Sequence, residues 1–389
     1  MTTSRDQQLK LVVDDDIECA REIFDPFGEL TLLEGRYLQA AQVSDADILL
    51  VRSVTPVTAQ LLGDAPVQFV GTATAGFDHI DLDMLAQRNI RFSAAPGCNA
   101  RAVAEHVIAI VLDAMTKPAN TTNRFEPQTI GIVGYGHVGQ ATAALAQAFG
   151  LQTLICDPPR GRQHDDVDYV DLKTVLGADV VTLHVPLTKT GSDHTFHLIA
   201  ARELAALNGS QLLINAARGG VIDESALHQR LEQPNPPRVA LDCWANEPDI
   251  DHTLLARVDW ASPHIAGHTI DARFKASCQL ADALSEFLQR ERAGVCAPAT
   301  STANVIEPGT QAPLASFQAV ISACVDVDLR TRRTREIASL PDAERGRAFD
   351  ALRREFGTRR EFHCHSIASA GMDADTAGRL RQMGFNQEA

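Results

Sequence analysis

A glycine-rich turn near the middle of the chain limits the possible folds more than any other stretch. Residues 129–133 form a short apolar, β-prone run, and Gly134, Gly136 and Gly139 follow it in the spacing G-x-G-x-x-G. An alanine-rich run to Phe149 then predicts a helix. In such a unit the first glycine permits the tight turn, the second lets the backbone approach a pyrophosphate, and the third lets the helix pack against the strand. The sequence therefore predicts a parallel α/β domain that binds a dinucleotide.

An acidic residue follows at the place where this kind of domain binds a ribose. Residues 152–156 predict the next strand, which ends in Asp157, eighteen positions after Gly139. A carboxylate there would accept a hydrogen bond from the ribose 2′-hydroxyl and would repel a 2′-phosphate. Asp157 therefore favours NAD over NADP. The nearby Arg160 and Arg162 oppose that preference, because their positive charges could attract a 2′-phosphate.

Length and charge limit the class of protein. A chain of 389 residues predicts two or three domains. The net charge of −15 disfavours non-specific binding to nucleic acid or membranes, so we expect neither as a partner. No apolar run is long enough to span a bilayer, and the first residues lack the shape of a secretory signal. The eight cysteines are scattered without a C-x-x-C pair, which is typical of reduced thiols in a cytoplasmic protein.

The glycine turn lies in the second of three expected regions. Alternating strand-like and helix-like stretches in residues 1–100 indicate another parallel sheet with helices on both faces. This region lacks a glycine fingerprint, so we expect it to bind substrate. The helical run 273–289 would return the chain to it, giving a discontinuous substrate-binding domain of residues 1–100 with 268–292. Residues 101–267 would form the Rossmann-like NAD-binding domain, beginning with a buried helix over 101–115.

Residues 293–389 are expected to form a small C-terminal α+β domain. A linker over 293–313 comes first, followed by strand-like runs at 324–329 and 361–367 and a charged helix around 343–356. The core of this region is too small to be stable alone, so it should dock on its neighbour or on a second copy of the chain. Its arginine-rich stretch predicts a solvated face, with a dimer interface or a positive field on a substrate phosphate as alternatives: Arg330, Arg332, Arg333 and Arg335.

Three later motifs resemble those of the D-isomer-specific 2-hydroxyacid dehydrogenases. They are Asn215-Ala-Ala-Arg-Gly-Gly, Leu241-Asp-Cys-Trp-Ala-Asn-Glu-Pro and Ser262-Pro-His-Ile-Ala-Gly. In the front half, residues 51–55, 69–76 and 92–99 look like the branch that oxidises 4-phospho-D-erythronate with NAD in pyridoxal 5′-phosphate synthesis. The tail is similar to the dimerisation domain of that branch. The resemblance covers nearly the whole chain and implies an oxidoreductase, a phosphorylated 2-hydroxy acid as substrate, and a homodimer formed through residues 293–389.

The resemblance implies a catalytic set of Arg218, Glu247 and His264, and the chemistry of each residue suits its role. An imidazole titrates near neutrality and can take the hydroxyl proton, so we expect oxidation to accelerate as the pH rises. Glu247 would bond the other ring nitrogen, and Arg218 would offer a permanently charged planar fork to the substrate oxygens. Taken singly, each has an ordinary structural explanation. Together, at the ends of predicted strands, they favour an active site.

The resemblance also implies the binding residues. Asp242 would hold the nicotinamide carboxamide, and Val185 would give only a backbone contact. His268 stands where the branch has a tyrosine among its substrate contacts, and a histidine can still donate to a phosphate. The predicted cofactor-binding residues are Gly134, Gly136, His137, Val138, Gly139, Asp157, Val185, Ala216, Ala217, Arg218, Asp242 and Gly267. The predicted substrate-binding residues are Ser53, Thr74 and His268, together with Arg52, whose place in the turn 51–55 predicts a contact with the substrate phosphate.

Two other functions fit the same residues. D-3-phosphoglycerate dehydrogenase shares the catalytic trio and also acts on a phosphorylated acid. A catalytically inactive, NAD-sensing regulator of the same fold is the alternative outside the enzymes. No metal site is predicted, because Pro263 and Gly267 break any helix that would pair His264 with His268. The run His363-Cys364-His365 would place alternate side chains on opposite faces of a strand.

Overall fold

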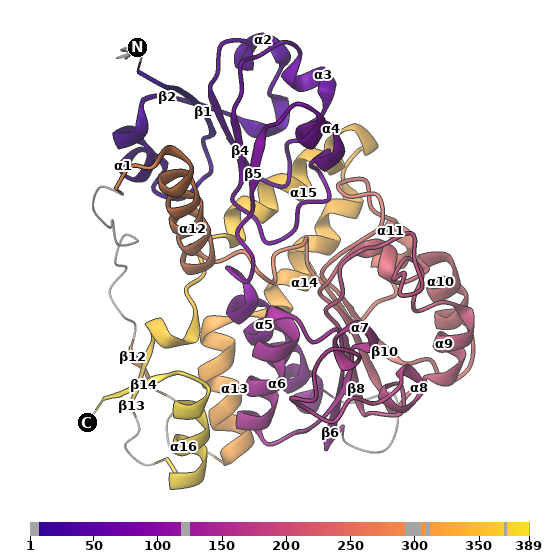
Figure 1. The fold of residues 1–389 in the computed structure, drawn as a ribbon. Coiled ribbons are helices and arrows are strands. Elements are labelled where there is room, and N and C mark those ends of the chain that lie inside the picture. Colours follow the sequence, from indigo (N-terminus) through magenta and orange to yellow (C-terminus); the bar gives the residue numbers. More distant parts are fainter. Residues whose placement is uncertain (1–7, 118–124, 292–304, 308–311, 369–371, 389) are drawn as a thin grey trace. The chain divides into compact units, whose positions relative to one another are not determined.

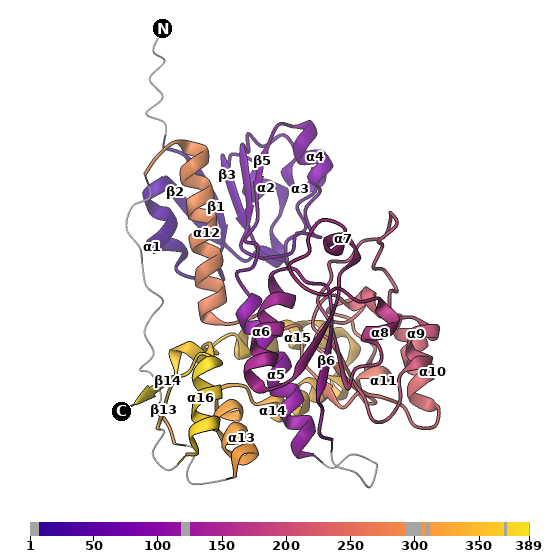
Figure 2. The same ribbon diagram turned by 60° about the horizontal axis from the view of Figure 1, so that its bottom comes forward.

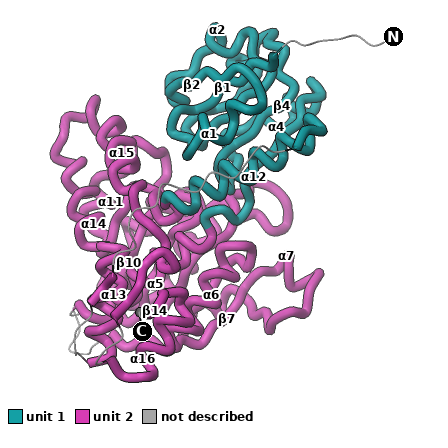
Figure 3. Tube along the Cα trace, turned by 90° about the vertical axis from the view of Figure 1, so that its left-hand side faces the viewer, with its two compact units in different colours: residues 1–99, 270–301 teal, residues 100–269, 302–389 magenta. Residues whose placement is uncertain are grey.

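The computed structural model describes residues 8–117, 125–291, 305–307, 312–368 and 372–388 (Figure 1). The chain divides into two compact units, residues 1–99 with 270–301 and residues 100–269 with 302–389 (Figure 3). The predicted linker, 293–313, lies almost entirely outside the described residues. Among the helices of the described part, none is both long and apolar enough to cross a membrane.

The first unit contains a five-stranded parallel sheet in the order β2-β1-β3-β4-β5. Helix α12 packs on this sheet because Leu280, Ala281 and Leu284 share a core with Leu50 and Phe69. The strands are β1 (Lys10–Asp14), β2 (Glu29–Leu33), β3 (Ile48–Val51), β4 (Phe69–Thr72) and β5 (Arg91–Ser93). The helices are α1 (Ala20–Phe24), η1 (Asp25–Phe27), η2 (Gly35–Tyr37), α2 (Ala40–Val43), α3 (Ala59–Leu62), α4 (Leu82–Gln87) and α12 (Ile270–Leu288).

The second unit contains a six-stranded parallel sheet in the order β11-β10-β9-β8-β6-β7. The chain runs from β6 outward to β7 and then crosses back to β8, so the strand order reverses between β6 and β8. Open sheets of this kind bind ligands at the carboxyl ends of their strands, at that reversal. The predicted parallel α/β fold is confirmed. The strands are β6 (Thr129–Val133), β7 (Gln152–Cys156), β8 (Val180–Leu183), β9 (Leu212–Asn215), β10 (Arg238–Leu241) and β11 (Trp260–Ala261).

The helices of this unit include one that is buried along most of its length. Every residue of α5 from Ala102 to Ala114 is buried, including Glu105, His106 and Asp113. Such a helix needs packing partners on all sides, and it needs a partner for each buried polar group. The helices around the sheet are α5 (Ala100–Thr116), α6 (His137–Phe149), α7 (Pro158–Gly161), α8 (Leu172–Val175), α9 (Ala201–Ala206), η3 (Gly219–Val221), α10 (Glu224–Glu232) and α11 (His252–Leu255).

The C-terminal elements supply several of these partners. Helix α13 lies against α5 and α16 lies against α6 (Figure 2). Phe317, Val320 and Phe362 belong to the same hydrophobic core as α5 and α6, so this region docks on its own chain. A small parallel sheet in the order β12-β13-β14 completes it. Its elements are β12 (Val305–Ile306), α13 (Pro313–Cys324), α14 (Val327–Glu336), η4 (Ile337–Ser339), α15 (Asp342–Phe356), η5 (Phe362–Cys364), β13 (Ser366–Ala368), α16 (Ala374–Gln382) and β14 (Asn386–Glu388).

Three local expectations for the C-terminal region are wrong. The run 324–329 is not a strand but the junction of two helices, because the Asp326 side chain accepts from Leu329 N (2.8 Å) and caps α14. Only the end of the run 361–367 is a strand, since η5 precedes β13. Arg330 does not lie on a solvated face: it is 4% exposed and donates to His106 Nδ1. Periodicity alone could not reveal this, because the partner is more than two hundred residues away.

Glu105 provides a test of how the C-terminal elements are attached. Its fully buried carboxylate accepts from Arg359 Nη1 (2.6 Å), Arg101 Nε (2.9 Å) and Phe362 N (2.8 Å). Glu105→Gln would leave the buried Arg359 charge uncompensated and should lower the free energy of unfolding by about 3 kcal/mol. Urea unfolding measures this. Asp375→Asn, which breaks the exposed Arg379 pair, is the control and should leave the midpoint nearly unchanged. Equal effects of the two changes would contradict the assignment.

Candidate active site

The predicted glycine turn joins β6 to α6. Gly134 has φ +93°, which favours glycine, and a Cβ on Gly139 would lie 2.0 Å from Gly134 O. By contrast, a Cβ on Gly136 would meet no atom within 4 Å, so its backbone faces open space. The exposed His137 and half-buried Val138 open helix α6, whose first N–H groups have no intrahelical acceptor. The turn therefore fits a pyrophosphate at the positive end of a thirteen-residue helix.

Asp157 lies at the end of β7, beside this turn. Its Oδ2 accepts from Tyr135 N (2.7 Å), and its Oδ1 accepts from Arg160 N (3.0 Å). The first bond ties the carboxylate to the glycine turn and the second caps the short helix α7. Arg160 and Arg162 are turned to other acids, Asp166 and Asp193. This arrangement is suited to a ribose diol and opposes a 2′-phosphate.

The other predicted cofactor contacts follow the remaining strands at the same edge of the sheet. Val185 follows β8 and lies beside Gly134, since a Cβ added there would come within 2.9 Å of Val185 Cγ1. Ala216 and Ala217 follow β9, where Ala217 N donates to Asn215 Oδ1 (3.1 Å). Gly267 follows β11 and is half-buried. The fold thus gathers residues from six strands at one edge.

Asp242 follows β10 and is 2% exposed. Its Oδ1 accepts from Ser262 Oγ (2.6 Å) and Ile265 N (2.8 Å), and both oxygens accept from Ala266 N (3.1 and 3.0 Å). Burial opposes its ionisation, but the neighbouring His106 and His264 side chains and these hydrogen bonds lower the pKa of Asp242 below its usual value. The carboxylate therefore clamps residues 262–269, called here the histidine loop.

His264 and Glu247 form the central pair of the site. His264 Nδ1 lies 2.7 Å from Glu247 Oε2, while Glu247 Oε1 accepts from Trp244 N (2.8 Å). Burial opposes ionisation of Glu247, but His264 and Arg353 outweigh it and lower the pKa of Glu247. An ionised carboxylate can only accept, so Nδ1 carries the proton and Nε2 is the unprotonated nitrogen of a neutral ring. His264 has φ +55°, a left-handed backbone that histidine adopts only where its surroundings impose it.

The loop that carries Arg218 packs directly against the loop that carries Glu247. A Cβ on Gly219 would lie 2.0 Å from Trp244 O, and Cys243 Sγ donates to Ala217 O (3.3 Å). Only glycine at 219 permits this approach. Arg218 is half-buried, and its Nη1 donates to Ala217 O (2.8 Å). The structure therefore brings the loops of all three predicted catalytic residues together.

Three of the predicted substrate-binding residues lie in the first unit, after β3 and β4. Ser53 is exposed, and Thr74 Oγ1 donates to Gly76 O (2.7 Å). Arg52 Nε donates to Asp14 Oδ1 (3.0 Å) and Nη2 to Asp16 Oδ2 (2.5 Å). Two carboxylates thus engage the Arg52 guanidinium, and its contact with a phosphate stays a prediction.

The fourth, His268, lies in the second unit at the end of the histidine loop. A Cβ on Gly357 would lie 2.9 Å from His268 Nε2, so the imidazole packs on the backbone that follows α15. The structure thus places His268 between His264 and the C-terminal elements.

Sequence reasoning missed the residues that support the pair. Trp244 Nε1 donates to Ser262 O (2.9 Å), which links the Glu247 loop to the histidine loop. Glu224 accepts from Ala245 N (2.6 Å), and burial, with the charges of Asp251 and Glu247, raises the pKa of Glu224 to about 7. Glu224 lies four residues after the motif that ends at Gly220, and no spacing rule identified its partner.

Cys243, Glu247 and His264 place potential metal ligands within 4.8 Å of one another. Burial raises the pKa of the Cys243 thiol well above its usual value, and Glu247 and His264 are engaged with each other. A protonated thiol is a poor metal ligand. These properties favour acid–base chemistry over a metal site.

Known proteins match the chain in sequence and in fold. The family model for the D-isomer specific 2-hydroxyacid dehydrogenase NAD binding domain matches residues 100–266. Erythronate-4-phosphate dehydrogenase of Marinobacter nauticus is 40% identical over 380 residues, spanning 96% of this chain and 98% of the relative. The enzyme of the same name from Escherichia coli O127:H6 is 38% identical over 384 residues, spanning 97% and 98%.

Two solved structures share the fold. D-lactate dehydrogenase from Aquifex aeolicus, complexed with NAD and lactic acid, superposes with a TM-score of 0.61 at 22% identity, covering 72% of this chain and 95% of that one. NAD-dependent formate dehydrogenase from Staphylococcus aureus gives 0.60 at 21% identity, covering 72% and 96%. At these identities the likeness establishes the fold alone, whereas the sequence relatives establish the family. The chain carries an NAD-binding domain and belongs to the erythronate-4-phosphate dehydrogenases, a branch of the D-isomer specific 2-hydroxyacid dehydrogenase family.

Proposed function

We propose that this chain is an NAD-dependent dehydrogenase that oxidises 4-phospho-D-erythronate to (R)-3-hydroxy-2-oxo-4-phosphobutanoate in pyridoxal 5′-phosphate synthesis. The family membership supports the substrate class. The observation that carries the reaction is the 2.7 Å contact between His264 Nδ1 and Glu247 Oε2 at the ligand-binding edge of the second sheet.

In this proposal His264 is the base. With Nδ1 protonated and facing Glu247, Nε2 is the nitrogen that takes the proton from the C2 hydroxyl. The ring then becomes an imidazolium beside an ionised carboxylate, which stabilises the charge that forms. Glu247 therefore fixes the tautomer before the reaction and stabilises the product of proton transfer.

Arg218 would bind the substrate carboxylate through its guanidinium, which the bond to Ala217 O orients. When NAD is bound, it accepts the hydride from C2. The pyrophosphate would lie at Gly136, His137 and Val138, and the ribose at Asp157. Ala216, Ala217, Asp242, Gly267 and Val185 are assigned to the rest of the cofactor, and Ser53, Thr74 and His268 to the substrate.

The domain roles belong to the same proposal. Residues 1–100 with 268–292 would bind substrate, residues 101–267 would bind NAD, and residues 293–389 would form a homodimer. The absence of a glycine fingerprint from residues 1–100 supports the first assignment.

The substrate is tested by comparing kcat/KM for 4-phospho-D-erythronate and D-3-phosphoglycerate with the purified protein. We expect the four-carbon acid to be preferred by roughly 10-fold or more, because a site shaped for it leaves polar groups unpaired with the shorter one. The reverse order would identify a phosphoglycerate dehydrogenase. Tight NAD binding with no NADH formed from either acid would instead identify a regulator.

His264→Asn tests the base, since asparagine tolerates the left-handed backbone better than most residues. We expect kcat to fall by about 10²- to 10⁴-fold, as for loss of a general base, while the Kd for NAD stays nearly constant. Stopped-flow NADH absorbance and NAD titration measure the two quantities. His363→Asn, at an exposed histidine, is the control and should behave as wild type. A normal kcat in His264→Asn would refute the assigned role.

The raised pKa of Glu224 makes the stability of the folded protein depend on pH. The folded protein keeps the Glu224 proton up to about pH 7, whereas the unfolded chain releases it near the usual glutamate pKa of 4.5. The folded state therefore binds more protons between these values, and its stability falls as the pH rises through that window. Glu224→Gln should remove this part of the loss, so its melting temperature should drop less than that of wild type between pH 5 and pH 8. Parallel melting curves would show that Glu224 does not titrate there.

A further inference from the structure

The C-terminal elements bond to both ends of the histidine loop. Before the loop, Ala261 N donates to Thr331 Oγ1 of α14 (3.2 Å). After His264, Arg359 Nη2 donates to Ala266 O (3.4 Å), and Thr269 Oγ1 donates to Glu361 Oε1 (3.2 Å). These contacts arise within one chain. The family model of the NAD-binding domain matches residues 100–266, so the C-terminal elements that hold the histidine loop lie outside that domain.

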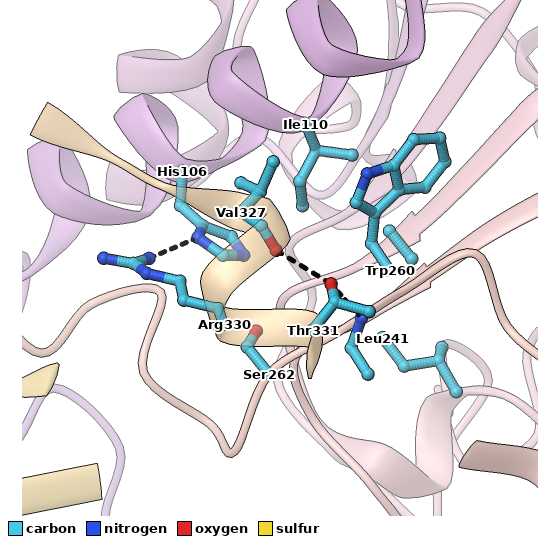
Figure 4. A pocket seen from close by; sticks show the side chains of 10 residues that line it. His106, Ile110, Leu241, Trp260, Ser262, Val327, Arg330 and Thr331 are labelled. Carbon is cyan, nitrogen blue, oxygen red and sulfur yellow. Dashed lines mark hydrogen bonds between the residues drawn. The ribbon is translucent and has the colours of Figure 1, made fainter. Parts of the chain in front are cut away.

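Arg330 lies one residue before Thr331 on α14, and its side chain reaches His106 of α5. Figure 4 shows its guanidinium bonded to His106, and Ser262 of the histidine loop lines the same cavity. Arg330 Nη1 donates to His106 Nδ1 (2.9 Å), so a neutral His106 must carry its proton on Nε2. Burial lowers the pKa of His106 to about 3, which keeps the ring neutral.

Ser262 connects this cluster to the Asp242 carboxylate, because Ser262 Oγ donates to Asp242 Oδ1 (2.6 Å) and Ser262 lines the same cavity as His106 and Arg330. Burial lowers the pKa of Arg330 to about 9, with repulsion from Arg359 adding to the effect and attraction to Asp242 opposing it. Arg330 is thus still protonated at neutral pH. Because Asp242 is buried and holds Ser262, Ile265 and Ala266, it needs a compensating cation, and a neutral His106 cannot be that cation.

The space between these groups is too small for another ligand. His106, Ser262, Arg330 and Thr331 line a cavity of about 10 Å³, together with apolar residues. That is roughly the room one water occupies. The cluster is therefore suited to holding residues in place and not to binding a substrate.

We propose that Arg330 is a positioning residue: held by His106 at the cavity that Ser262 also lines, it balances the charge of Asp242, whose clamp on the histidine loop keeps His264 aimed for proton transfer. The C-terminal region is thus part of the catalytic apparatus of its own chain, in addition to any role in dimerisation. This inference rests on the proposed function for its kinetic consequences, but the clamp itself can be measured without turnover.

Arg330→Met removes the charge and keeps the length of the side chain. We expect kcat to fall by about 10- to 100-fold, as for a small misplacement of a reacting group, with little change in the KM for NAD. Hydrogen exchange at the Ile265 and Ala266 amides should accelerate. Arg332→Met is the matched control, an exposed arginine on the same helix, and should leave kcat and exchange unchanged. Arg330→Lys restores the charge and should recover most of the lost kcat.

A purely structural role would lower the melting temperature of Arg330→Met without changing kcat per folded molecule, and that result would overturn the proposal. Unchanged protection of Ile265 and Ala266 would overturn it as well. Should Arg330→Met not fold, Thr331→Val decides: loss of the acceptor for Ala261 N should lower kcat and deprotect that amide, and wild-type values in both would refute the link. If wild type oxidises no 2-hydroxy acid, the proposed function fails, while amide exchange in Arg330→Met still tests the clamp.

Discussion

The buried carboxylate of Asp242 is the interaction on which the site depends. It accepts hydrogen bonds from a hydroxyl and two backbone amides of the histidine loop, at the cost of placing a charge where water cannot reach it. Those bonds hold His264 in a left-handed conformation that it would not adopt alone. The cation that we propose to offset the charge, Arg330, comes from a distant part of the chain, where His106 of α5 holds it. The reactive geometry is therefore a property of the whole second unit and not of one loop.

Much of this architecture could be predicted from local pattern. The glycine spacing and the acid after the next strand identify the cofactor-binding turn, because each glycine answers a steric demand visible in the turn itself. The burial of the helix over 101–115 could also be predicted, because apolar residues occur on more than one face of the expected helix. The catalytic trio was predicted from resemblance, and the fold brings the loops of its members together. Their chemical roles remain predictions.

What could not be predicted depends on long-range pairing of charges. Arg330 belongs to an arginine-rich stretch that predicts a solvated surface. In the structure it is buried and donates a hydrogen bond to His106 of α5. Arg52 was expected to meet a phosphate, but Asp14 and Asp16 engage it, and nothing in the spacing of these three residues indicates the contact. The run 324–329 is apolar enough for a strand, and only the Asp326 cap turns it into a helix start. The outcomes for Arg330 and Arg52 were decided by partners that the local sequence does not contain, whereas the Asp326 cap is a local signal that the strand prediction missed.

Helix α5 has consequences for how such a chain could be shortened or recombined. Its buried Glu105 and His106 both bond to arginines of the C-terminal region, and α13 covers its apolar flank. A protein cut after α12 would expose the apolar surface of α5 and leave Glu105 and His106 without their arginine partners. Such a protein would be prone to aggregation. Residues 289–389 are thus needed to cover α5 and cannot simply be removed. A shorter homologue built on the same two sheets would need a helix of different composition at this position. The flank that is apolar here would have to carry polar side chains.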